Sequence, residues 1–133
     1  MTPIRMAQYG TRHGHADGKL AALRGCADVE LAGVFEPDAA RRAALDRPGT
    51  AYHGVQWLRH ASEILDDPTI AAVASEGRND ESLEQTAAIV RAGKHVWYDK
   101  PAGDDWTGWQ KVVAEARARD LRIQVGYMFR YHE

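Results

Sequence analysis

Residues 92–103 read AGKHVWYDKPAG, and this stretch predicts the end of a helix, a short buried strand and a turn that carries an ionisable pair. Gly93 is expected to end the helix, because glycine adopts the left-handed conformation at a helix C-terminus at the lowest cost. His95–Tyr98 is rich in β-branched and aromatic residues, which favour a strand. Asp99 and Lys100 would then lie just beyond the carboxyl end of that strand, where open α/β sheets bind their ligands.

Short apolar stretches alternate with helical patterns along the rest of the chain. The patterns predict strands at 4–9, 29–35, 70–75, 95–98 and 122–128, a brief one within 47–52, and helices at 16–23, 39–45, 62–65, 82–92 and 105–119. Asp38 is expected to cap the second helix, and Ser82 with Gln85 has the spacing of a capping box. This order predicts a single domain over residues 1–133, an α/β fold with a doubly wound parallel sheet of about six strands and helices on both faces.

The composition is ordinary for a globular chain, with 44% hydrophobic and 27% charged residues over 133 positions. The formal net charge of -2 gives no electrostatic reason to expect nucleic acid or an anionic membrane as a partner. The single cysteine, Cys26, excludes an intrachain disulfide and a cysteine-based zinc cluster. The sequence has no signal-peptide or membrane-span pattern, so we expect a cytoplasmic protein.

The loop after the first predicted strand has only part of a dinucleotide-binding pattern. Gly10 stands where the first glycine of GxGxxG belongs, whereas Arg12 and His15 occupy the other two positions and Gly14 lies between them. Arg12 would either supply a guanidinium to an anion or crowd the site. Taken alone, this loop favours an ordinary strand–helix turn over phosphate binding.

Glu36 strengthens the cofactor interpretation, because it lies about twenty residues beyond the loop, at the end of the second predicted strand. A carboxylate there accepts hydrogen bonds from the ribose hydroxyls of adenosine and repels a 2′-phosphate, which favours NAD over NADP. The alternative is a solvated acid in a turn. Arg41 and Arg42 are close enough in sequence to stack on adenine, although charge on a helix surface is the simpler role.

The chain resembles the glucose–fructose oxidoreductase/inositol dehydrogenase/MocA (Gfo/Idh/MocA) family in four stretches that follow the family's order: IRMAQYGTRHGHADGKLAAL, VELAGVFEPDAARRAAL, AGKHVWYDKPAG and IQVGYMFRYHE. The resemblance implies the Rossmann-type domain of an NAD(P)-dependent oxidoreductase that acts on sugars, polyols or similar hydroxy compounds. It also implies a second domain with the substrate pocket and the oligomer interface, which this chain lacks. We therefore expect the chain to be inactive alone and a complete form to be a homo-oligomer.

The resemblance also assigns residues. Lys100 matches the lysine of the family's EKP motif, close to the nicotinamide and the reacting hydroxyl, and is the expected catalytic residue. Asp99 replaces the glutamate of that motif, Asn79 matches an asparagine after the fourth strand, and Arg130 matches an arginine near the nicotinamide end. The expected cofactor contacts are Gly10, Thr11, Arg12, His13, Glu36, Arg41, Asn79, Asp99, Lys100 and Arg130.

Two other functions stay open at this point. The chain could be a non-catalytic nucleotide-binding module that acts through a partner chain, which Arg12 in place of glycine would suit. It could also hold a metal at His13 and His15, with Asp17 as a further ligand. Because the sequence places no third strong ligand beside these histidines, we expect no metal, with NAD as cofactor and a small carbohydrate-like molecule as substrate.

Overall fold

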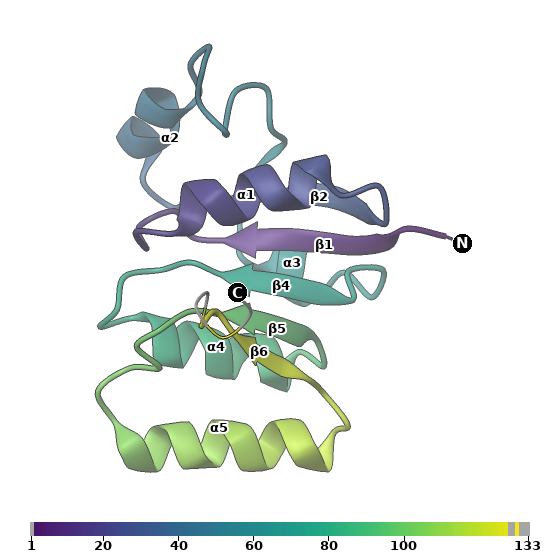
Figure 1. Ribbon diagram of the computed structural model, residues 1–133, viewed down its shortest axis with the longest axis vertical. Coiled ribbons are helices and arrows are strands. Elements are labelled where there is room, and N and C mark those ends of the chain that lie inside the picture. Colours follow the sequence, from purple (N-terminus) through teal and green to yellow (C-terminus); the bar gives the residue numbers. More distant parts are fainter. Residues whose placement is uncertain (1, 128–129, 131–133) are drawn as a thin grey trace.

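The computed structural model describes residues 2–127 and residue 130. Within these residues, six strands form one parallel sheet in the order β3-β2-β1-β4-β5-β6 (Figure 1). The strands are β1 (Ile4–Tyr9), β2 (Val29–Phe35), β3 (Trp57–Leu58), β4 (Ala72–Ser75), β5 (His95–Tyr98) and β6 (Ile123–Val125). The helices are α1 (Ala16–Gly25), α2 (Ala39–Leu45), α3 (Ser62–Leu65), α4 (Ser82–Arg91) and α5 (Trp106–Ala118). This strand order is that of the Rossmann fold. From β1 the chain adds strands toward one side of the sheet, and from β4 it adds them toward the other, so the order reverses between these two neighbouring strands.

Helices cover both faces of the sheet, and each face has its own buried cluster (Figure 1). On one face, Leu20 of α1 packs with Val34 of β2 and with Tyr52. On the other face, α3, α4 and α5 each contribute a buried residue, namely Ile64, Ile89 and Val112. Strands that are apolar on both faces are expected in a parallel sheet whose connections are helices. None of the helices in the described residues combines the length and the apolar character needed to cross a membrane.

Most predicted elements are confirmed, with small changes at their ends. The third strand is the exception, since it is Trp57–Leu58 and not part of 47–52. The hydroxyl of Thr50 donates to the carbonyls of Leu45 and Arg47, which holds that segment in a turn. β4 begins two residues later than predicted, because the N–H of Ile70 still bonds to the preceding turn. β6 ends at Val125, and the predicted end at residue 128 lies outside the described residues.

Two predicted features of helix ends are confirmed, and one predicted capping interaction does not form although α4 begins at Ser82 as predicted. Asp38 caps α2, and its Oδ1 accepts the N–H of Arg41 at 3.0 Å. Gly93 follows α4 with φ +77°. The capping box of Ser82 and Gln85 does not form, because tertiary partners outside α4 take both side chains. These partners are the Tyr98 hydroxyl, 3.0 Å from the Ser82 hydroxyl, and the Tyr9 carbonyl, 2.8 Å from the Gln85 amide nitrogen.

The carboxyl ends of β1, β4 and β5 meet at one edge of the sheet, at the left of Figure 1. At this edge the loops after β1 and β4 touch at Gly10. Its φ is +87°, and a Cβ atom there would lie 2.8 Å from the backbone nitrogen of Gly77. The N–H groups of Arg12 and His13 donate to the carbonyl of Glu76 at 2.9 and 3.0 Å. The two loops therefore form one continuous surface that depends on glycine at position 10.

Gly10→Ala should lower the free energy of unfolding by about 2–5 kcal/mol. A left-handed residue with a side chain costs about 1–2 kcal/mol, and a methyl group pressed against backbone adds about 1–3 kcal/mol. Urea denaturation followed by circular dichroism measures this loss. Gly49→Ala is the matched control, because Gly49 has φ +88° but no atom within 4 Å of its Cβ position. Equal losses in the two variants would contradict the role of the close approach.

Candidate functional site

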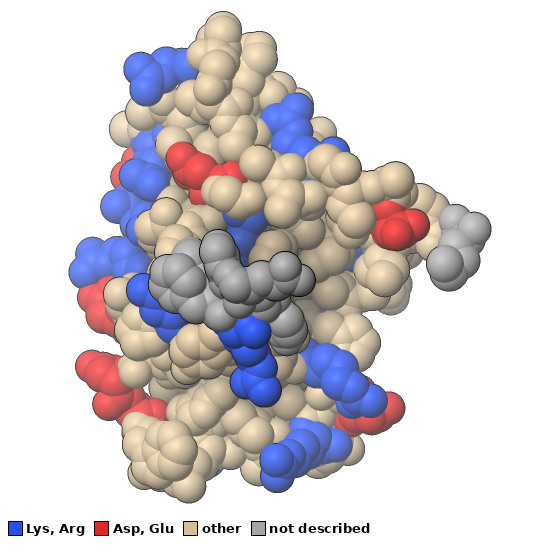
Figure 2. All heavy atoms as spheres, in the orientation of Figure 1, with Lys and Arg blue, Asp and Glu red and all other residues tan. Residues whose placement is uncertain are grey.

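Three hollows adjoin the loop after β1, and two of them share Arg12 and Arg78 at the carboxyl edge of the sheet. The β2-side hollow has a volume of about 640 Å³, and its lining includes Gly10, Arg12, Glu36 and Gly77. The β5-side hollow has a volume of about 400 Å³, and its lining includes Arg12, His13, Asn79, Lys100 and Pro101. Lys and Arg side chains gather along the same edge, with acidic side chains between them, at the left of Figure 2. Together the hollows span the point where the strand order reverses, which is where doubly wound sheets bind ligands.

Glu36 is buried at the end of β2, with 1% of its surface exposed. The Thr11 hydroxyl donates to its Oε2 at 2.6 Å, and the N–H of Asp38 donates to its Oε1 at 3.1 Å. Guanidinium nitrogens of Arg12 and Arg41 lie 3.9 and 3.8 Å from the same carboxylate. The alternative of a solvated acid in a turn is therefore wrong, because four groups fix this side chain.

The two arginines beside Glu36 connect the loop after β1 to the segment after β2 by hydrogen bonds. Arg41 donates from Nε to the Thr11 hydroxyl at 2.6 Å and from Nη2 to the Thr11 carbonyl at 2.7 Å. A role as plain charge on the helix surface is therefore wrong for Arg41. The guanidinium of Arg12 donates to Asp38 at 2.8 Å, so it lies toward the end of β2. The N–H of Arg41 holds the pKa of Asp38 below its usual value, and the Arg12 guanidinium adds to this effect.

The β5-side hollow brings together residues from three distant segments. Asn79 comes from the loop after β4, Lys100 from the turn after β5 and His13 from the loop after β1. The Nε2 atom of His13 lies 3.0 Å from the Lys100 carbonyl, and this contact links the loop after β1 to the turn after β5. Arg130 lines neither the β2-side nor the β5-side hollow; its side chain is exposed, and its N–H donates to the Tyr127 carbonyl at 3.1 Å.

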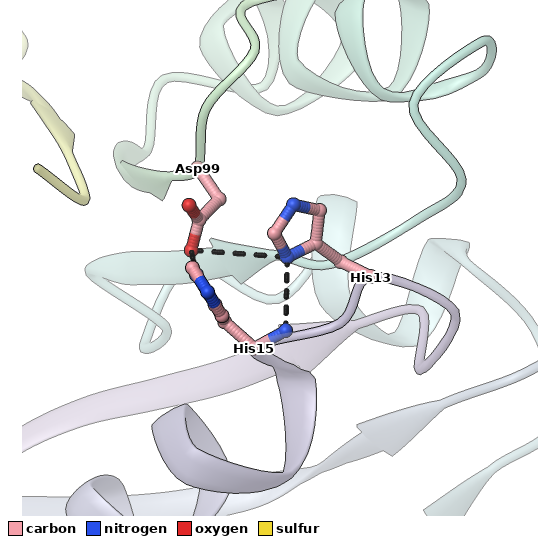
Figure 3. Close-up of side chains that lie close together, drawn as sticks. All are labelled: His13, His15 and Asp99. Carbon is pink, nitrogen blue, oxygen red and sulfur yellow. Dashed lines mark hydrogen bonds and ion pairs between the residues drawn. The ribbon is translucent and has the colours of Figure 1, made fainter.

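Asp99 is 2% exposed and lines the third hollow together with His15 and Lys19. Its Oδ2 is 3.0 Å from Nδ1 of His15 (Figure 3). The same oxygen is 3.2 Å from Nζ of Lys19, and Oδ1 accepts the N–H of Lys100 at 2.8 Å. Burial alone would raise the pKa of Asp99, but the Lys19 ammonium and these hydrogen bonds outweigh it and hold the pKa below its usual value. Asp99 therefore fixes the backbone of Lys100, and its direct contact with a cofactor stays a prediction.

Comparison with known proteins identifies the family. A family model described as "Oxidoreductase family, NAD-binding Rossmann fold" matches residues 5–127. The chain belongs to the Gfo/Idh/MocA family. It is 32% identical over 68 residues to a 1,5-anhydro-D-fructose reductase from Ensifer adhaerens, a match that covers 51% of this chain and 20% of the relative.

Solved Gfo/Idh/MocA-type structures share the fold. The chain superposes on an NAD-binding protein from Listeria innocua with a TM-score of 0.84 and 22% identity, over 100% of this chain and 36% of the other. It superposes on a 3-ketoreductase from Actinomadura kijaniata, solved in complex with NADP and TDP-benzene, with a TM-score of 0.83 and 24% identity, over 98% of this chain and 39% of the other. The chain thus spans well under half the length of these relatives.

Two buried charged residues of this Gfo/Idh/MocA domain were not expected from the sequence. Lys19 is 5% exposed, donates to Oε1 of Glu76 at 2.5 Å and lies 4.8 Å from the centre of the Trp97 ring. Glu76 is fully buried, and burial raises its pKa although the Lys19 ammonium opposes the rise. Their positions in the sequence could have indicated this burial. Lys19 precedes Leu20 on the apolar stripe of α1, and Glu76 directly follows the apolar strand β4.

Lys19→Met should destabilise the domain by about 3–5 kcal/mol at pH 7, because two buried carboxylates lose their ammonium partner. In this variant the folded carboxyl pKa values would lie above their unfolded values near about 4. A raised folded pKa contributes stability that is present below the unfolded pKa and is lost as the pH rises. The penalty should therefore shrink between pH 7 and pH 5 in urea denaturation.

Lys111→Met is the control for the Lys19 variant, since Lys111 is exposed on α5. It should change the free energy of unfolding by less than about 0.5 kcal/mol at either pH. A Lys19→Met penalty of the same size at both pH values would contradict the assigned carboxylate pairing.

Proposed function

We propose that this chain is the cofactor-binding part of an oxidoreductase that transfers hydride between NAD and a sugar, polyol or similar small hydroxy compound. The observation that carries the proposal is the pair of hollows that share Arg12 and Arg78 at the strand-order reversal. The family supports the cofactor class. The named activity of the Ensifer relative, a 1,5-anhydro-D-fructose reductase, supports the substrate class.

The residues present fit a dinucleotide. Gly10 lets the loops after β1 and β4 close into one surface over which a pyrophosphate can lie. α1 begins at Ala16, directly after the loop, and no side chain caps its first turn. The N–H of Ala16 donates to the His13 carbonyl at 3.1 Å, so the N–H groups of Asp17 and Gly18 are the ones available to an anion, which the positive end of the helix dipole also attracts. The β2-side hollow would take the adenosine end and the β5-side hollow the nicotinamide end.

The chain's own residues divide the work between binding and chemistry. Glu36 would accept the ribose hydroxyls, with Thr11 and Arg41 fixing its carboxylate. When bound, the nicotinamide supplies the hydride acceptor or donor. Lys100 would hydrogen-bond the substrate hydroxyl and stabilise negative charge on its oxygen as hydride leaves. Asn79 would help to hold the nicotinamide end. A cytoplasmic location and a homo-oligomeric complete form stay expectations.

The proposed preference for NAD over NADP depends on Glu36. A carboxylate at the end of β2 repels a 2′-phosphate and binds a free ribose diol. Arg12 and Arg41 lie close enough to weaken that repulsion, and one structural neighbour is solved with NADP. Both cofactors must therefore be compared directly.

Glu36→Ala should weaken NAD(H) binding by about tenfold to a hundredfold, or about 1–3 kcal/mol, because the ribose hydroxyls lose their acceptor. Calorimetric titration of the chain with NAD⁺, NADH and NADPH measures this change and the preference between cofactors. Glu30→Ala is the matched control, since Glu30 lies on the same strand near its other end and is exposed. Unchanged NAD(H) affinity in Glu36→Ala would assign Glu36 a purely structural role, and no binding at millimolar cofactor would remove the proposed function from this chain.

Lys100→Met should leave the NAD(H) affinity of the chain within a few-fold of its original value, because the ammonium serves the substrate. In a longer Gfo/Idh/MocA protein with the same lysine, the corresponding change should lower turnover by about 10²–10⁴-fold. Steady-state kinetics measures the second effect. Near-normal turnover would exclude the catalytic role and favour the alternative of a non-catalytic nucleotide-binding module.

A further inference from the structure

Three side chains from two distant segments converge beside the β5-side hollow (Figure 3). His13 and His15 come from the loop after β1, and Asp99 follows β5. One ligand atom from each of these residues lies within 4.8 Å of the others. We propose that His13, His15 and Asp99, together with Glu76, bind one divalent ion of the zinc class. Asp17, the third ligand considered from the sequence, is not in this group.

The distances between the ligand atoms suit a small cation. Oδ2 of Asp99 lies 3.0 Å from Nδ1 of His15 and 3.8 Å from Nδ1 of His13. Ligand atoms bound at about 2.0–2.2 Å to one tetrahedral zinc ion lie roughly 3.3–3.6 Å apart. The ligand atoms of the two histidines lie within 4.8 Å of each other, so a movement of up to about 1.5 Å between these side chains would bring all three atoms onto one ion.

Glu76 gives independent support for a cation at this place. Its carboxylate is fully buried, and its Oε2 accepts no hydrogen bond from the residues that the structure describes. That oxygen lies 3.5 Å from Nδ1 of His13, whereas Lys19 binds the other oxygen of the same carboxylate. A buried carboxylate oxygen without a donor is costly. An ion beside His13 would satisfy it and complete a set of two nitrogen and two oxygen ligands.

The charge of the cluster also leaves room for a cation. Glu76 and Asp99 are both buried, and Lys19 is the ammonium that they share. The two carboxylates and the one ammonium together carry one negative charge, which is costly in a buried position. A divalent ion would turn this into one excess positive charge on a loop that faces an anionic ligand. That ligand is the phosphate of the proposed function, although metal binding itself does not depend on it.

Existing hydrogen bonds already orient the histidines for this role. Nε2 of His13 lies 3.0 Å from the Lys100 carbonyl, which can only accept, so the proton is on Nε2 and the lone pair of Nδ1 points into the cluster. A backbone carbonyl on the second ring nitrogen is the usual support of a metal-binding histidine. The ion would replace the 3.1 Å bond from the His15 N–H to that lone pair. On binding, the His15 proton that lies between Nδ1 and Asp99 would move to Nε2, so that Nδ1 offers its lone pair to the ion.

The test is a titration of the untagged chain with Co²⁺, followed by displacement with Zn²⁺ and without any dinucleotide. We expect the visible absorption of four-coordinate Co²⁺, one ion per chain, a dissociation constant of about 1 μM or tighter and a higher Tm with Zn²⁺. His15→Ala should weaken binding at least tenfold, and its side chain is 32% exposed, so the fold should persist. Asp99→Asn should weaken binding similarly. Asp17→Asn and His60→Ala are the controls and should bind as the unaltered chain does.

Two results would overturn the proposal. One is the absence of saturable binding at one ion per chain, or unchanged affinity in His15→Ala. The other is an NMR spectrum in which His13 or His15 is an imidazolium at pH 7 in the metal-free chain and stays so after Zn²⁺ is added, because a proton then supplies the missing charge. Since no cofactor is present, either result leaves the proposed dinucleotide site untouched, and failure of NAD binding leaves the metal proposal untouched.

Discussion

The carboxyl edge of the sheet depends on one buried interaction, the Lys19 ammonium between the carboxylates of Glu76 and Asp99. It joins α1 to the ends of β4 and β5, which lie far apart in sequence. Burying three charged groups costs several kcal/mol for each, and one ammonium offsets that cost for two carboxylates only in part. The pKa values of the two carboxyl groups are therefore shifted in opposite directions. Burial raises the pKa of Glu76, whereas added donors from His15 and the Lys100 backbone help to keep the pKa of Asp99 low.

This interaction controls the position of Lys100. Asp99, held by Lys19, accepts the N–H of Lys100, and His13 binds the Lys100 carbonyl. The side chains of Asp99 and His13 thus fix both polar backbone groups of Lys100, while its own side chain is exposed at the hollow. A reactive group on a fixed backbone loses less conformational freedom when it meets its target. The buried charges therefore serve the site more directly than they serve the core.

The architecture could be predicted from the sequence, because the alternation of strand and helix patterns leaves few topologies. The third strand could not, because Trp57–Leu58 is too short to show a pattern. Burial of Glu36 was equally hidden, since the Thr11 hydroxyl that donates to it and the Arg41 guanidinium 3.8 Å away come from other segments. The same limit explains the metal ligands: Asp17 is near the histidines in sequence, but Asp99 is near them in space.

Arg12 shows how a departure from a motif can be accommodated. A side chain at the second glycine position could block the approach of a pyrophosphate, yet this guanidinium is drawn toward the end of β2 by Asp38 at 2.8 Å. The same contact places positive charge beside Glu36, which Arg41 flanks on another side. A carboxylate that is buried and flanked by two guanidinium groups repels a 2′-phosphate less than a free one does, since the opposite charges offset each other at close range. A carboxylate at the end of β2 therefore indicates NAD only as far as neighbouring arginines leave its negative charge uncompensated. Here Arg12, which replaces a glycine of the loop, also offsets part of the charge of Glu36 and so weakens the preference for NAD over NADP.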